Sequence, residues 1–218
     1  MIRARGPLPP RVSAPDLPRE FDDVGGLGPR ADLFAARIVS LEGQVDAAHS
    51  TLAECSIAEA SVDSLVLTGA TLTDVEFATL RATELLARDG RWRNVAIVGG
   101  RVGTLDLSGA DLDSVELRGV RIDFLSLRGA TVRDVLVADC VIGTLDLPLA
   151  KLARVRFEGC RADEVDADGL RAEHTDLRGL DAVSFGRPDS LRGVTLTHRQ
   201  VELAATDFAR ALGIDVQD

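Results

Sequence analysis

The sequence has little of what builds a membrane-spanning, disulfide-stabilised or secreted protein. Aromatic residues make up 4% of the chain, with no tyrosine and one tryptophan, so the core must consist mainly of small contacts between Leu, Val, Ile and Ala. Three cysteines in 218 residues do not make a disulfide framework. No apolar run reaches the ~18 residues of a membrane helix, and the opening MIRARGPLPPRVSAP lacks the apolar stretch of a secretory signal. We expect a protein of the reducing cytoplasm, with no membrane partner.

Positive charge is also scarce. The chain has 25 basic and 35 acidic residues, giving a net charge of −10. Nucleic acids and anionic membranes are bound by clustered Lys and Arg, which this balance disfavours. We therefore expect no direct binding to nucleic acid, and we look for a protein partner instead.

The chain does contain a strict period of five. Every fifth residue from Ala47 to Ala182 is apolar, and the column two positions earlier, from Val45 to Leu180, carries no charge. A period of five drifts around an α-helix and buries no constant face. A four-sided coil fits, because each side of the coil buries two side chains and then turns a corner.

Four such sides complete one square coil, and stacked coils pair as parallel strands. Residues 45–182 then form about seven coils at a strand spacing of ~4.8 Å. Leucine recurs every 20 residues from Leu65 to Leu145, valine does the same from Val75 to Val155, and the string GTLDL occurs at both 103–107 and 143–147. The predicted fold is all-β, a right-handed parallel β-helix of square coils with a C-terminal α-helix. A leucine-rich repeat is the alternative, but it needs an asymmetric repeat that this pattern lacks.

Several stretches of the chain resemble the pentapeptide-repeat protein family, whose unit is roughly A-(D/N)-L-x-x. They are TGATL (68–72), SGADL (108–112), RGATV (128–132) and DLRGL (176–180). The resemblance covers about two-thirds of the chain and implies a right-handed quadrilateral β-helix. The sequence departs from the family by carrying Leu or Val at many sites where the family prefers Ala. Residues 83–94, which include Trp92, keep the register but look unlike a repeat, and they predict either a bulging loop or short helix, or an imperfect coil.

The two ends of the chain differ from the repeats. Residues 1–30 predict an extended, partly mobile Pro/Gly-rich arm, and residues 31–44 a lead-in that caps the β-helix of residues 45–184. Residues 185–218 predict a helix that begins at a Thr197–Gln200 capping box and ends at Gly213. Its apolar face either covers the open end of the β-helix or forms a homodimer. That face comprises Val201, Ala204, Ala205, Phe208 and Leu212.

The residues that usually perform chemistry do not form recognisable motifs. The three histidines are far apart in the predicted stack, and none lies in a spacing typical of a metal site. The cysteines Cys55, Cys140 and Cys160 fall in the inward column, where they predict buried packing residues. We expect no catalytic residue, no cofactor and no metal, and we expect that the protein is not an enzyme.

Function is then expected on the outer surface, where acidic side chains recur. The candidate partner-binding residues are Asp106, Asp111, Asp113, Glu116, Asp146, Asp166 and Asp168. The acidic columns are also compatible with a merely solvated surface. The first functional hypothesis is a scaffold that binds an unidentified protein.

The second hypothesis comes from the resemblance. Some pentapeptide-repeat proteins mimic B-DNA, occupy the DNA-binding saddle of gyrase, a type II topoisomerase, and inhibit it or protect it from quinolones and toxins. A column of arginines disfavours such a mimic here, since DNA carries no basic groups on its outside. The column comprises Arg81, Arg101, Arg121 and Arg161.

Overall fold

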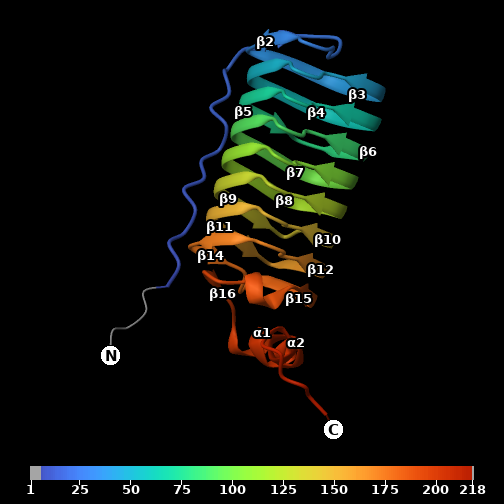
Figure 1. Ribbon diagram of the computed structural model, residues 1–218. Coiled ribbons are helices and arrows are strands. Elements are labelled where there is room, and N and C mark those ends of the chain that lie inside the picture. Colours follow the sequence, from blue (N-terminus) through green and yellow to red (C-terminus); the bar gives the residue numbers. More distant parts are fainter. Residues whose placement is uncertain (1–5, 218) are drawn as a thin grey trace.

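The chain winds into a parallel β-helix of about eight turns, followed by two short helices (Figure 1). The computed structural model describes residues 6–217. The predicted all-β fold with a helical C-terminus is therefore confirmed. The arm runs along one side of the stack, from near its C-terminal end to the first coil at the opposite end (Figure 1).

The regular elements are as follows. The strands are β1 (Asp22–Asp23), β2 (Asp32–Phe34), β3 (Ala36–Asp46), β4 (Thr51–Val66), β5 (Thr71–Phe77), β6 (Leu80–Leu86), β7 (Arg91–Asp106), β8 (Asp111–Ser126), β9 (Thr131–Ala138), β10 (Val141–Asp146), β11 (Lys151–Glu158), β12 (Cys160–Asp166), β13 (Arg171–Glu173), β14 (Thr175–Asp176), β15 (Leu180–Gly186) and β16 (Val194–Thr195). The helices are a 3₁₀ turn (Pro188–Ser190), α1 (His198–Leu203) and α2 (Ala205–Ala211).

Strands of neighbouring coils pair in the register that the leucine and valine columns predict. In β7 and β8, Leu105 pairs with Leu125 and Val95 pairs with Val115. The leucine column therefore stacks along one wall and the valine column along another. Both columns are buried, and the polar residues between them face outward.

In the central coils, three of the four corners have a positive φ and follow one another at the period of five. Gly109, Ser114 and Gly119 follow one another at this period, and each has a positive φ, which turns the chain between two sides. The repeated GTLDL string has a second cause. A Cβ on Gly103 or Gly143 would collide with a backbone carbonyl oxygen of the coil before it, so these two positions of the wall admit only glycine at this backbone spacing.

Residues 83–94 form a regular coil, which settles the alternatives that the sequence leaves open. They lie in β6, a short turn and the start of β7. Trp92 is 1% exposed and lies in the column between Leu72 and Leu112, its partners in the adjoining coils. Gly90 lies beside the indole. Because Gly90 has no side chain, the ring uses space that a side chain at position 90 would fill.

The β-helix begins earlier than residue 45. Strand β3 pairs with β4, and Ile38 stacks on Ile57. The spacing between these two residues is one residue shorter than a full coil. A bulge between Gly43 and Gln44 restores the full coil, so that Val45 stacks on Leu65. The inward positions are therefore displaced by one residue here, so every fifth residue is polar at this end of the chain although a coil is present.

The C-terminal end repeats this change of register and then becomes helical. Strand β16 pairs with β14, and Val194 stacks on Thr175, again one position short of a full coil. The predicted capping box is present, because Thr197 and Gln200 hydrogen-bond each other's backbone N–H. The single predicted helix is wrong in one respect, since it is divided at Ala204 into α1 and α2.

Candidate interaction surfaces

The interior of the β-helix is filled by apolar side chains. A hollow of about 20 Å³ between the leucine and valine columns is lined by apolar residues alone. A larger groove of about 450 Å³ lies between β15 and helices α1 and α2, and it opens to solvent. Among residues 6–217, no three His, Cys, Asp or Glu side chains lie close enough together to hold a metal ion.

Two of the predicted partner-binding carboxylates belong to the wall of the helix. Asp106 is 7% exposed and Asp146 is 6% exposed. Arg88 donates to Asp106 at 2.5 Å, and Arg128 donates to Asp146 at 3.1 Å. Ser126, which lies between them in the column, donates its hydroxyl to Asp146 at 2.8 Å. These two carboxylates therefore bind neighbouring coils together and present little surface to a partner.

Three of the other predicted acids lie at the surface beside arginines. Asp111 lies 3.5 Å from Arg133, and Asp168 lies 3.9 Å from Arg187. Glu116 accepts a hydrogen bond from Arg118 at 2.6 Å. Pairs between exposed groups are individually weak, which applies to Asp111 and Asp168, whereas the side chain of Glu116 is only 22% exposed.

Asp113 and Asp166 complete the predicted set. Both are half-buried, and neither forms an ion pair with a residue of the described range 6–217. Asp166 accepts the backbone N–H of Asp168 at 3.1 Å. The partner-binding role of the whole set stays a prediction.

The predicted arginine column is present on one face. Arg81, Arg101 and Arg121 occupy matching positions of successive coils. Arg101 donates to Asp123 at 3.0 Å, and Arg121 lies 3.6 Å from the same carboxylate. The hydrogen bond from Arg101 lowers the pKa of Asp123 from its ordinary value. Positive and negative groups thus alternate on this face.

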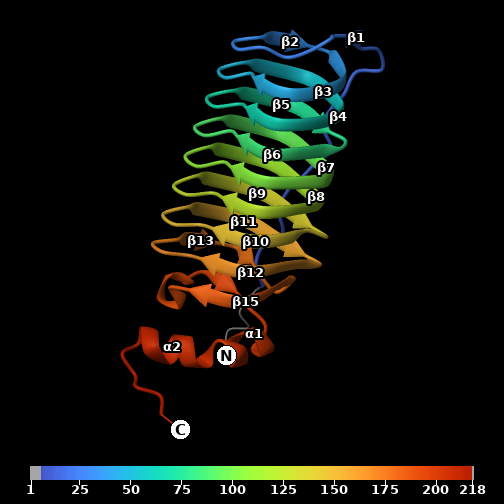
Figure 2. The ribbon, with the colours of Figure 1, turned by 90° about the vertical axis from the view of Figure 1, so that its right-hand side faces the viewer.

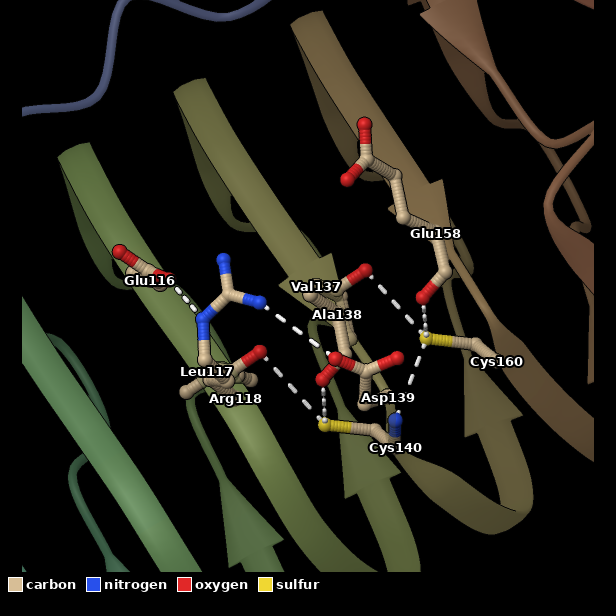
Figure 3. Close-up of polar contacts among 9 residues, drawn as sticks. All are labelled: Glu116, Leu117, Arg118, Val137, Ala138, Asp139, Cys140, Glu158 and Cys160. Atoms are coloured by element: carbon tan, nitrogen blue, oxygen red, sulfur yellow. Dashed lines mark hydrogen bonds and ion pairs between the residues drawn. The ribbon is translucent and has the colours of Figure 1, made fainter.

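Cys140 and Cys160 lie one coil apart in the inward column, as the sequence predicts (Figure 3). Their thiols point to backbone carbonyl oxygens, with Cys140 Sγ 3.2 Å from Ala138 O and Cys160 Sγ 3.3 Å from Val137 O. The Cys160 thiol and burial both raise the pKa of Cys140. This thiol is therefore a packing residue with little tendency to ionise.

The apolar face of the C-terminal helices is only partly covered. Ala204 is 6% exposed, and Phe208 packs against the core. The amide of Gln200 donates to the carbonyl oxygens of Leu177 and Leu180, so α1 caps the last coil. Figure 2 shows both helices lying across this end of the stack.

The remaining predicted residues of this face point to solvent. Val201 is 45% exposed and Leu212 is 78% exposed, and Ala205 is exposed as well. The homodimer through this face stays a prediction.

The arm is held by a row of side chains that sequence reasoning missed. We call this row, Asp74, Asn94, Ser114 and Asp134, the polar ladder. The four members occupy the same corner in four successive coils, and each of them has a positive φ. In a left-handed corner Asp and Asn are tolerated better than most residues, and here their side chains face the arm.

Main-chain groups of the arm make most of the contacts with the polar ladder. The N–H of Arg11 donates to Asp134 Oδ1 at 2.9 Å, and the N–H of Asp16 donates to Asp74 Oδ1 at 2.9 Å. Ser13 contacts the two middle members, with its N–H 3.4 Å from Ser114 Oγ and its hydroxyl 3.1 Å from Asn94 Oδ1. The predicted arm is thus extended, and residues 11–16 are docked along four coils.

The lowered pKa values of several buried carboxylates predict that the stability of the fold is sensitive to acid. The Arg154 guanidinium lowers the pKa of Asp134, and Arg178 lowers the pKa of Asp176. Burial raises the pKa of Asp106, but hydrogen bonds from Ser108 and Arg88 outweigh it, and the net pKa is lowered.

A carboxylate whose pKa is lower in the folded state stabilises the fold above its unfolded pKa, and this stability is lost as the pH falls through the folded value. We expect the Tm to be nearly constant from about pH 8 to 5 and to fall below about pH 4, where ordinary carboxylates titrate. Calorimetry across this range checks it. A Tm that stays constant down to about pH 2 would contradict the pairing.

Neither the comparison with protein families nor the comparison with curated proteins finds a match. Within residues 6–217, no helix has the length and apolar character needed to cross a membrane.

Proposed function

We propose that the protein is a non-enzymatic scaffold that binds another protein through the outer faces of its β-helix. One observation carries the proposal: apolar side chains fill the interior along its whole described length, so contact with other molecules falls to the outside. The outside is rigid and regular, because each face repeats from coil to coil in register. A rigid surface binds a partner without a large entropy cost of ordering.

The faces differ enough in chemistry to be tested one at a time. The first variant, Arg101→Ala with Arg121→Ala, removes two members of the arginine column. The second, Asp111→Ala with Asp113→Ala, changes a different face of the same coils. All four side chains are exposed or half-buried, so both variants are expected to stay folded.

The experiment is affinity capture from cell extract with the wild-type chain and both variants as baits, followed by quantitative mass spectrometry. We expect one protein to be captured by the wild type and by one of the variants. The other variant is expected to capture at least tenfold less of it. A heat-denatured bait is the control for capture by unfolded chain. Equal capture by all three folded baits would contradict a face-specific scaffold.

A gyrase-binding DNA mimic is the second candidate function. The net charge of −10 and the rod-like stack support it. The ion pairs on the arginine face weaken it, since they interrupt the continuous negative bands that a mimic needs. We place the scaffold first for this reason. In either function we propose a cytoplasmic protein, since its three cysteines are free and buried.

A further inference from the structure

The contact between the arm and the polar ladder has the chemistry of peptide recognition. Of its five hydrogen bonds, four use backbone groups of the arm: the N–H groups of Arg11, Ser13 and Asp16 and the carbonyl oxygen of Ala14, which accepts from Asn94 at 3.3 Å. The fifth uses the Ser13 hydroxyl. The polar ladder therefore reads an extended main chain more than it reads the side chains of the arm.

The composition of the arm suits this type of recognition. Between residues 6 and 20 the chain carries five prolines, Pro7, Pro9, Pro10, Pro15 and Pro18. Proline favours the extended polyproline conformation, which has no internal hydrogen bonds and leaves each remaining N–H free for a partner. Arg11 and Asp16 each directly follow a proline, and the backbone N–H of each donates a hydrogen bond to a carboxylate of the ladder.

The arm is held at the surface. No residue between 6 and 20 is buried, and Leu8 is 52% exposed. Five hydrogen bonds, of which one is 3.4 Å long and one is 3.3 Å long, must offset the entropy lost by ordering the segment. Segments of this kind open at far lower free energy than the core of a domain.

The ladder itself is built into the rigid part of the molecule. Its four members are fixed by the coil register, and Asp134 is further held by Arg154, which donates to it at 2.5 and 2.7 Å. Asp74 is held by the amide of Asn94 in the next coil. The acceptors therefore stay in place when the arm leaves.

We propose that the polar ladder is a docking site for an extended, proline-containing segment of a protein partner, which the arm occupies until the partner displaces it. The proposal rests on the scaffold function and names the surface and the partner chemistry for it. It differs from the arginine face tested above, which lies on another side of the coil, whereas Asp113 of the aspartate variant directly precedes Ser114 of the ladder.

The test uses the full chain with its arm released. Arg11→Pro with Asp16→Pro removes the two donors of 2.9 Å and keeps the extended backbone of the arm, while the ladder stays intact. A fluorescein-labelled peptide of residues 6–20 is titrated into this variant and into the wild type, and binding is followed by anisotropy. We expect the variant to bind the peptide at least tenfold more tightly, because the wild-type arm competes for the same site.

Two controls identify the site. A peptide with the same two prolines is expected to bind at least tenfold more weakly. Asp74→Gly with Asn94→Gly, added to the released variant, removes two acceptors at corners whose positive φ glycine adopts easily, and it is expected to abolish peptide binding while circular dichroism stays unchanged. Equal affinity of wild type and released variant, no binding to the released variant, or binding that survives the glycine substitutions would each overturn the proposal.

Failure here is distinguishable from failure of the scaffold function. If the peptide does not bind but a face variant loses a captured protein, the scaffold stands and the ladder proposal is wrong. A wild-type dimer in light scattering that becomes monomeric in the released variant would show that the arm of a second copy is the occupant, and it would also overturn the partner proposal.

Discussion

Excising residues 103–122, one complete coil, is expected to leave a folded protein with a cooperative thermal transition. The cut joins Val102 to Asp123, and Val102 occupies the same position of its coil as Ile122. Every later residue then keeps its face. Circular dichroism and calorimetry check this, and we expect the spectrum per residue to stay unchanged.

A shorter excision is the matched control and has the largest expected effect. Removing residues 103–120 shifts the following chain by two positions, which places Asp123, Arg128 and Arg133 in the inward column. Burying an unpaired charge costs several kcal/mol per ion. The total stability of a typical domain is roughly 5–15 kcal/mol, which is too small to offset the burial of several charged side chains in one column. We expect no cooperative transition. Equal folding of the two deletions would show that the coil register does not determine the fold.

Trp92→Ala is expected to destabilise the protein by about 3–5 kcal/mol, as large-to-small changes of buried aromatic residues do. The indole is 1% exposed and separates Leu72 from Leu112, so its removal leaves a cavity between coils that cannot collapse without breaking strand pairs. Urea denaturation followed by circular dichroism measures the free energy of unfolding.

Trp92→Phe separates the ring from its polar group. Trp92 Nε1 has no hydrogen-bond partner within residues 6–217. A buried unpaired N–H costs about 1–3 kcal/mol, so its loss offsets part of the lost contact area. We expect Trp92→Phe to destabilise by less than about 1.5 kcal/mol. A cost of less than about 1 kcal/mol for Trp92→Ala would mean that the coil tolerates a void here.

The fold could be predicted from the sequence because its period is visible residue by residue. The leucine and valine columns specify both the length of the coil and the walls that face each other, and the structure confirms their register. The first coil was missed because Ile38 stacks on Ile57, one position short of a full coil, which a test at every fifth residue cannot detect.

The surface could be predicted less well because outward positions are defined by their neighbours. Asp106 and Asp146 look like a free acidic column in the sequence, yet Arg88 and Arg128 reach them from the preceding coil. The polar ladder gave a weak signal, since Asp74, Asn94 and Asp134 recur at the coil period or a multiple of it. Nothing in the sequence placed the arm beside them.

A gyrase supercoiling assay tests the central claim most directly, namely that paired surface charges serve a protein-binding scaffold and not a DNA mimic. The purified chain is titrated at low and high salt, with and without a quinolone. Electrostatic mimicry weakens with salt, because the Debye length falls from about 10 Å at 0.1 M to about 3 Å at 1 M. We expect no change in supercoiling or cleavage at protein concentrations of tens of micromolar. Salt-sensitive inhibition or protection at micromolar protein would contradict it and would establish the DNA-mimic function.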